Sequence, residues 1–245
     1  MKLRKAWYLG VVAVLGLALA TSGCSGTKTE SESSAEVETV AKYERPAKVE
    51  SPDEALTLLK EGNERFVADE ITVKDFSDAN LQTLSKGQQP FAVILTCSDS
   101  RVPAELLFDQ GIGDIFVIRV AGNVIDPIAL GSVEYAVEHL GSPLVVVMGH
   151  QGCGAVKAAV AGGKAPGSIG SIVAMLLPSV KAAKASGAKT DAQIAETAAD
   201  MNVDRMIGVL ETSPIIEEAL KAKELKVVGA KYILDTGVVD WAGGE

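Results

Sequence analysis

The sequence predicts an α/β fold: a mainly parallel central β-sheet flanked by helices, in a single domain. Short apolar runs alternate along the chain with longer segments of helical character, which is the pattern of βαβ units. Two of these runs, residues 91–96 and 144–148, carry no charge, as strands buried on both faces do. The chain has 245 residues, of which 47% are hydrophobic, and this is enough for a large core.

The first predicted helix begins after Ser51, with Pro52 at its first position and Glu54 completing a capping box, and it continues to about residue 68. The later elements are expected as strands over 91–96, 114–120 and 144–148, a helical turn over 103–108, helices over 127–140, 154–161, 169–185 and 192–223, and a final hairpin of 226–233 with 237–241. A break is expected within the last helix near Ser213-Pro214.

Residues 1–23 have the layout of a secretory signal peptide, with a basic start, an uncharged run over 6–20 and small residues before Cys24. The run is shorter than the roughly 20 residues that span a bilayer. The ending Ser-Gly-Cys resembles the bacterial lipoprotein signal, in which the cysteine is lipidated, although Thr21 stands where leucine is usual. An uncleaved anchor and a simple secreted protein are the alternatives, and all three place the domain outside the cytoplasm.

Residues 24–50 are expected to form a lipidated, polar tether, because they hold few large apolar side chains and cannot offset their ordering entropy. The tether would hold a catalytic domain, 51–245, at a membrane facing the periplasm or the cell exterior. The chain has 23 Lys and Arg against 32 Asp and Glu, a net charge of −9, which excludes a general nucleic-acid binder. Three cysteines exclude a disulfide framework.

Two strand ends carry the candidate chemistry. The stretch CSDSR, 97–101, directly follows the first strand, and HQGCG, 150–154, directly follows the third. Ligands of parallel sheets bind at the carboxyl ends of the strands. Two thiols, one imidazole and one carboxylate are zinc ligands, whereas Mg²⁺ and Ca²⁺ prefer oxygen. On spacing alone, a zinc site, a disulfide between Cys97 and Cys153, and two unlinked buried thiols all remain open.

The CSDSR stretch, with H-x₂-C-G about fifty residues later, resembles the β-class carbonic anhydrases. The resemblance runs from about residue 52 to 241 and is densest over 87–161. It implies that Cys97, His150 and Cys153 bind zinc. It also implies a dyad of Asp99 and Arg101, in which Asp99 either takes the fourth zinc position or pairs with Arg101 and leaves zinc open to water.

The resemblance assigns further residues to the pocket. They are a substrate-positioning Gln88, an apolar wall at Phe116, Tyr135 supplied across a dimer interface, the backbone N–H of Gly154 for bicarbonate, and His139 as a proton shuttle. A histidine at a helix end is the plainer interpretation of His139. Ile94 stands where some family members carry the Trp of an inhibitory bicarbonate pocket, which favours a site that is open at rest.

The resemblance implies zinc-dependent, reversible hydration of carbon dioxide to bicarbonate and a proton by a zinc-bound hydroxide, in a homodimer or higher homo-oligomer. One alternative is hydrolysis of carbonyl sulfide or carbon disulfide on the same scaffold. Another is a non-catalytic zinc-binding module tethered to a membrane, which would have no need of the Asp99–Arg101 dyad.

Overall fold

The computed structural model describes residues 41–44, 46, 48–49 and 51–242. The predicted signal peptide, Cys24 and most of the predicted tether lie outside the described residues. The described residues all belong to one compact unit, Thr39–Glu245. Among them, no helix is both long enough and apolar enough to cross a membrane.

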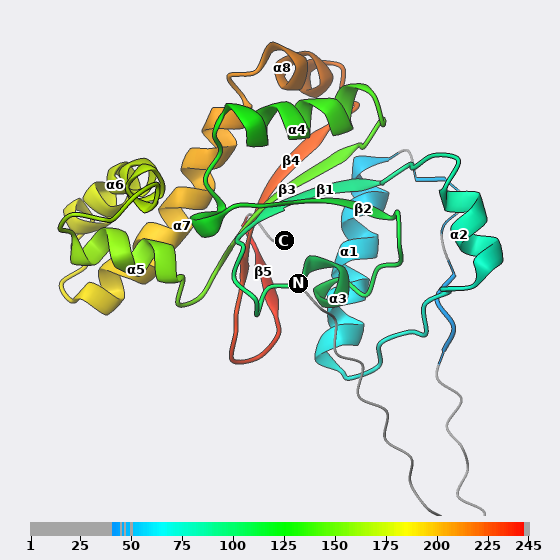
Figure 1. The fold of residues 1–245 in the computed structure, drawn as a ribbon, viewed down its shortest axis with the longest axis horizontal. Coiled ribbons are helices and arrows are strands. Elements are labelled where there is room, and N and C mark those ends of the chain that lie inside the picture. Colours follow the sequence, from blue (N-terminus) through cyan, green and yellow to red (C-terminus); the bar gives the residue numbers. More distant parts are fainter. Residues whose placement is uncertain (1–40, 45, 47, 50, 243–245) are drawn as a thin grey trace, which may run out of the picture. The chain divides into compact units, whose positions relative to one another are not determined.

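A five-stranded sheet with the order β2-β1-β3-β4-β5 forms the centre of this unit (Figure 1). Its strands are β1 (Ala92–Thr96), β2 (Ile115–Arg119), β3 (Leu144–His150), β4 (Lys226–Tyr232) and β5 (Val239–Trp241). All neighbouring pairs are parallel except β4 and β5, which form the expected antiparallel hairpin. The mainly parallel sheet is therefore confirmed, and β1 and β3 flank the point at which the strand order reverses.

Helices cover both faces of the sheet (Figure 1). They are α1 (Pro52–Val67), α2 (Asp78–Leu84), α3 (Ala104–Leu107), α4 (Pro127–Glu138), α5 (Gly154–Ala161), α6 (Ile169–Ala185), α7 (Asp191–Leu210) and α8 (Pro214–Lys221), with a short 3₁₀ turn, η1 (Ala121–Asn123). One core joins the sheet to helices α4 to α8, and the other joins it to α1 and α3. The single α/β domain is confirmed.

Strand β1 shows why both faces must be covered. Val93 and Leu95 face the core of α4 to α8, whereas Ala92 and Ile94 face the core of α1 and α3, and all four are fully buried. Successive side chains of a strand point to opposite faces, so an uncharged run buries both. Each large aliphatic side chain buried in this way stabilises the fold by about 1.5–3 kcal/mol.

Capping residues set the helix boundaries much as predicted. The Ser51 hydroxyl accepts a hydrogen bond from the Glu54 N–H at 3.5 Å at the start of α1, but between these two described residues no hydrogen bond returns from the Glu54 side chain, so only half of the predicted capping box is formed. The expected break after α7 is also present, since Ser213 caps α8 and Pro214 is its first residue. Helix α2 was not predicted from the sequence. It buries none of its residues, so it offers no apolar face for a sequence pattern to reveal.

The described end of the predicted tether contacts the domain. The Tyr43 N–H donates to the carbonyl of Val73, and the Val73 N–H donates to the carbonyl of Ala41, each at 2.9 Å. The Tyr43 hydroxyl also bonds the side chains of Gln110, at 3.1 Å, and Asp114. The polar composition of the segment gave no indication that Tyr43 binds the domain. The chain therefore joins the domain before residue 51.

Candidate metal centre

The three predicted zinc ligands converge at the carboxyl ends of β1 and β3, which we call the metal edge of the sheet. Cys97 directly follows β1, His150 is the last residue of β3, and Cys153 is the N-cap of α5. Parallel pairing sets Thr96 opposite Met148, which brings the two strand ends level. One ligand atom from each of the three residues lies within 4.8 Å of the others, close enough to share a single ion.

The chemistry of this cluster fits a zinc ion. Both cysteines are buried free thiols, so the structure does not adopt the disulfide alternative. The Nδ1 atom of His150 lies 2.9 Å from the carbonyl oxygen of Gln151, whereas its buried Nε2 atom has no hydrogen-bond partner. The carbonyl can only accept, so Nδ1 carries the proton and Nε2 keeps a free lone pair. A buried acceptor without a partner beside two thiols is what a zinc ion would satisfy.

The cluster also favours thiolate. Hydrogen bonding from Cys153 lowers the pKa of Cys97 to about 4, and the Gly122 N–H contributes in the same direction against the opposing effect of burial. The Gly122 N–H lies 3.2 Å from the Cys97 sulfur. The same contact raises the pKa of Cys153, because two adjacent sulfurs resist carrying two negative charges. A divalent cation would relieve that conflict and bind both as thiolates.

Asp99 pairs with Arg101 at the mouth of the cluster. Two parallel hydrogen bonds join the side chains, Nε to Oδ1 at 2.9 Å and a terminal guanidinium nitrogen to Oδ2 at 2.8 Å. The Arg101 N–H adds a third bond to Oδ1 at 3.0 Å. Oδ2 of Asp99 lies 3.9 Å from Nε2 of His150. Of the two arrangements considered for Asp99, the structure therefore has the one that pairs it with Arg101, as Ile94 led us to expect.

This pairing fixes the charge of Asp99. Hydrogen bonding from the Arg101 side chain, aided by the Arg101 backbone N–H and by nearby positive charge, holds the pKa of the Asp99 carboxyl well below its usual range. The same contacts raise the pKa of Arg101. At any working pH the dyad is thus a carboxylate bonded to a guanidinium, and Asp99 can accept hydrogen bonds but cannot donate a proton.

Supporting contacts that the sequence did not reveal hold both ligand loops. The Arg119 guanidinium donates to the carbonyls of Cys97, at 3.0 Å, and Asp99, at 2.5 Å. The Gly152 N–H, between His150 and Cys153 in the chain, donates to the Glu196 carboxylate at 2.8 Å. Arg119 and Glu196 belong to distant elements, β2 and α7, so no local motif marks them.

Gly154 lies where the sequence analysis placed it, as the first residue of α5 directly after Cys153. The first N–H groups of a helix have no partner within the helix. The Gly154 N–H is therefore a donor beside the cluster, suited to an anion such as bicarbonate.

The other predicted pocket residues lie away from the metal edge. Phe116 pairs with Val93, near the start of β1, and its ring lies 6.5 Å from that of Tyr135. Tyr135 lies 5.2 Å from His139, the C-cap of α4, five residues before β3 begins. Gln88 is exposed four residues before β1. The structure places these four residues near the amino ends of the strands, and it does not bring them to the cluster within one chain.

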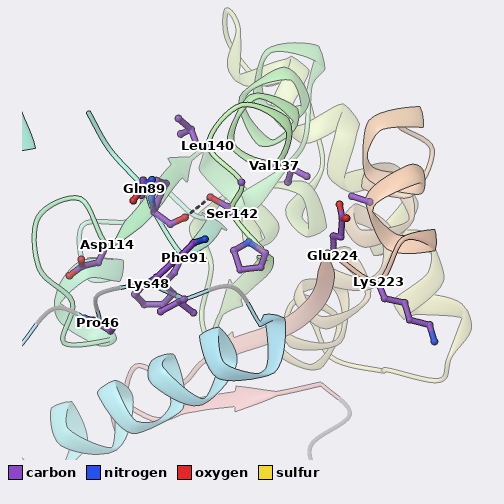
Figure 2. A pocket seen from close by; sticks show the side chains of 15 residues that line it. Pro46, Lys48, Gln89, Phe91, Asp114, Val137, Leu140, Ser142, Lys223 and Glu224 are labelled. Atoms are coloured by element: carbon purple, nitrogen blue, oxygen red, sulfur yellow. Dashed lines mark hydrogen bonds between the residues drawn. The ribbon is translucent and has the colours of Figure 1, made fainter. Parts of the chain in front are cut away.

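A cavity of about 510 Å³ also lies at the amino ends of the strands (Figure 2). Phe91, Leu140, Ser142 and Glu224 are among its lining residues, and the Ser142 hydroxyl donates to the carbonyl of Pro90 at 2.7 Å. None of the predicted site residues lines it. This cavity is therefore separate from the metal cluster.

Comparisons with known proteins agree with the metal cluster. Residues 92–239 match the family described as "Carbonic anhydrase". The chain is 43% identical over 192 residues to "Carbonic anhydrase 2" of Mycobacterium tuberculosis (strain CDC 1551 / Oshkosh), which covers 76% of this chain and 91% of that relative.

Solved structures share the fold. A match with one of the tetrameric β-carbonic anhydrases of the ascomycete Sordaria macrospora has a TM-score of 0.63 and 28% identity, and it covers 67% of this chain and 86% of that one. The β-carbonic anhydrase CafA of Aspergillus fumigatus matches with a TM-score of 0.64 and 27% identity, over 79% of this chain and 91% of that one.

Proposed function

This chain belongs to the carbonic anhydrase family, in its β class, and on that premise we propose that it catalyses the reversible hydration of carbon dioxide to bicarbonate and a proton. Zinc is its cofactor, held by Cys97, His150 and Cys153. The single observation that carries the proposal is the buried, unbonded Nε2 of His150 beside two free thiols, with the ion pair of Asp99 and Arg101 at the mouth of the same cluster.

The protein supplies a rigid, anionic set of ligands for the metal. When bound, zinc provides the Lewis acidity that makes hydroxide available from water near neutral pH. The carbonyl of Gln151 fixes the ring of His150, so that Nε2 is the atom presented to the ion. The Gly122 N–H and the turn at Gly152 hold the two thiols in place.

The dyad orients the nucleophile. Asp99 is ionised and faces the cluster, since its Oδ2 is 3.9 Å from His150, and a water molecule there would donate one hydrogen bond to this carboxylate. That bond leaves an oxygen lone pair directed at carbon dioxide. Arg101 holds Asp99 in this position through a planar, bidentate contact that lysine could not reproduce. The N–H of Gly154 is available to the bicarbonate product.

We propose that the active unit is at least a homodimer. Two observations support this. The row formed by Phe116, Tyr135 and His139 runs from the edge strand β2 onto α4, and Tyr135 is 47% exposed despite its size. Gln88 is exposed as well. Gln88, Phe116 and Tyr135 would complete the metal site of a second copy. The Sordaria macrospora relatives are named as tetrameric.

We also propose that the protein is exported and attached to a membrane by a lipid on Cys24, facing the periplasm or the cell exterior. The support is the sequence of residues 1–24 alone. Replacing Cys24 by Ser should release the domain from the membrane fraction or stop its processing, as read by fractionation and intact mass. Unchanged processing with membrane retention would favour an uncleaved apolar anchor.

The decisive experiment is stopped-flow hydration of carbon dioxide by protein whose zinc content has been measured, with carbonyl sulfide hydrolysis assayed in parallel. Zinc near one per chain and rapid hydration are expected. Zinc-loaded protein that hydrolyses carbonyl sulfide but does not hydrate carbon dioxide would assign the scaffold to the alternative reaction. Metal-free protein with an intact bond between Cys97 and Cys153 would contradict both assignments.

A further inference from the structure

A buried asparagine of α7 lies behind the metal ligand Cys97. The Asn202 amide nitrogen donates to the carbonyl of Gly122 at 3.0 Å, and the N–H of the same glycine donates to the Cys97 sulfur at 3.2 Å. Asn202 is fully buried and 80 residues away from Gly122 in the sequence. We propose that Asn202 is a positioning residue for the zinc centre, which fixes the direction of the Gly122 N–H and through it the Cys97 thiolate.

The orientation of Asn202 is itself set by a neighbour. The hydroxyl of Ser179, on α6, donates to Oδ1 of Asn202 at 3.3 Å, and Ser179 is 2% exposed. The Gly122 carbonyl can only accept, so the amide N–H₂ group of Asn202 must face it, and Oδ1 is left to accept from Ser179. A chain of contacts therefore runs from α6 through α7 to η1 and ends on a metal ligand.

The turn at Gly122 needs this support. Its φ of +71° lies in the left-handed region, and a Cβ there would come within 3.0 Å of Leu176 and 3.2 Å of Ala155, so only glycine fits. The η1 turn has three residues and no side-chain cap. Asn202 holds the carbonyl of Gly122 from the interior of α7, and this leaves the N–H of the same residue directed at the sulfur.

Hydrogen bonds to a thiolate stabilise its charge and fix its direction toward a metal. Partners of this kind behind metal ligands typically contribute 10–100-fold to metal affinity. Their loss also raises the energy of the sulfur lone pairs, which shifts sulfur-to-metal charge transfer to longer wavelength. The inference rests on the proposed zinc function, but its test reads out metal release and spectrum rather than catalysis.

The test compares Asn202→Ala and Asn202→Asp with Asn63→Ala. Asn63 is a matched control, because it is 5% exposed and also donates to two backbone carbonyls, of Leu107 at 3.1 Å and Gly237 at 2.9 Å, yet it touches neither ligand loop. Zinc transfer to a chelator and the sulfur-to-cobalt charge-transfer band of the Co²⁺-substituted protein are measured, with thermal unfolding of each variant as a check on folding.

We expect the Asn202 variants to release zinc about 10–100-fold faster than the unchanged protein and to shift the charge-transfer band to longer wavelength. Asn63→Ala should lose stability but leave both metal readouts unchanged. Ser179→Ala removes the hydrogen bond to Oδ1 of Asn202 but keeps the amide, so it should change zinc release and the charge-transfer band in the same direction by a smaller amount. If the Asn202 variants do not fold, the result for Ser179→Ala tests the proposal in their place.

Metal release and spectra that match those of Asn63→Ala would overturn the positioning role and leave the proposed function standing. If the Asn202 variants do not fold, unchanged zinc release and an unchanged spectrum in Ser179→Ala would also overturn the positioning role. An unchanged protein that binds no zinc at all would overturn the proposed function and this inference together.

Discussion

The two ends of the central sheet differ in whether one chain alone brings their predicted site residues together. The metal edge gathers the buried side chains of Cys97, His150 and Cys153, and the hydrogen-bonded pair of Asp99 and Arg101 lies at its more exposed mouth. The residues near the amino ends of the strands, among them Gln88 and Tyr135, are exposed and reach no metal ligand of their own chain. The chain therefore carries the three ligands of the metal centre and, on a separate surface, the residues that we propose complete the pocket of another copy.

Under this proposal, the metal chemistry takes place on one subunit, whereas the substrate is positioned between two. A metal must be held by ligands that are fixed before it arrives, and one rigid sheet provides this. A small neutral substrate needs walls and one or two polar contacts, which a neighbouring subunit can supply. Substitutions at the metal edge should accordingly act within one chain, whereas those at Gln88 and Tyr135 should act across the interface.

The largest effect is expected at the metal edge. Cys153→Ser should lose zinc and carbon dioxide hydration together, because two remaining ligands hold zinc poorly and the metal is needed to make hydroxide available. Metal analysis of the purified variant, run beside stopped-flow hydration, checks this. Full zinc occupancy in Cys153→Ser would mean that the cluster is not the metal site.

The dyad should give the next largest effect. Arg101→Ala leaves the three ligands intact and frees Asp99, whose Oδ2 already lies 3.9 Å from Nε2 of His150, to move toward the metal. We expect a folded protein with nearly full zinc and hydration lowered at least about 100-fold, the scale of losing a key electrostatic group. Zinc-quantified protein measured by stopped flow tests this, and rates equal to those of the unchanged protein would show that the dyad is not used.

The pH dependence of that loss follows from the sign of the shift. Arg101 lowers the pKa of Asp99, so the stabilisation from their pairing is fully present above the unfolded carboxyl pKa of about 4 and is lost only as the pH falls through the lower folded value. Asp99 is ionised from neutral to alkaline pH with or without Arg101. The defect of Arg101→Ala should therefore persist across that range unless hydroxide displaces the Asp99 carboxylate from zinc at alkaline pH. Hydration at the rate of the unchanged protein near neutral pH would contradict the competition between zinc and Arg101 for Asp99.

Much of the metal edge could be predicted because its residues follow strands directly in the sequence. An uncharged run predicts β1, and Cys97 is the next residue after it. His150 and Cys153 follow the apolar core of β3 in the same way. Chain direction in a parallel sheet then brings the two segments to one edge. The fold was predictable for the same reason, since most elements had a cap or an apolar run of their own.

The residues that the sequence did not reveal make contacts over long separations. Asn202 and Glu196 are polar positions of α7, and nothing local distinguishes them from solvated residues of an ordinary helix. Helix α2 buries nothing, and Tyr43 is one aromatic residue in a polar segment. Gly122, which follows the carboxyl end of β2 and has a positive φ, is the one local sequence feature that could have indicated a turn beside the metal ligands.

A mixing experiment tests the division between subunits. Gln88→Ala alone should lower hydration at least about tenfold, the scale of one lost hydrogen bond, and Cys153→Ser alone should be inactive. In a mixed dimer, the zinc site of the Gln88→Ala chain would receive an intact Gln88 from its partner. Random reassociation should restore about a quarter of the original activity, because half of the dimers are mixed and each has one complete site.

Reassociation of each variant with itself is the control for that experiment, and light scattering at assay concentration confirms that dimers are present. Activity equal to the mean of the two separate variants would show that Gln88 serves its own chain or no site at all. A fully active monomer would remove the need for a second copy altogether.

The smallest effect is expected at His139. A group that must transfer the proton in each turnover contributes about 10²–10⁴ to the rate. His139 is exposed, caps α4 and contacts only the ring of Tyr135 among the predicted site residues, and its own chain places it at the opposite end of the sheet from His150. We therefore expect His139→Ala to change turnover less than about threefold even in weak buffer, because buffer and water can carry the proton in its place.

Stopped-flow turnover of His139→Ala in weak and strong buffer, with and without added imidazole, tests this prediction. Tyr135→Phe is the control that separates loss of the histidine from disturbance of its neighbour. A loss of tenfold or more in weak buffer that imidazole repairs would instead place His139 beside the metal site of a second subunit and make it the proton shuttle.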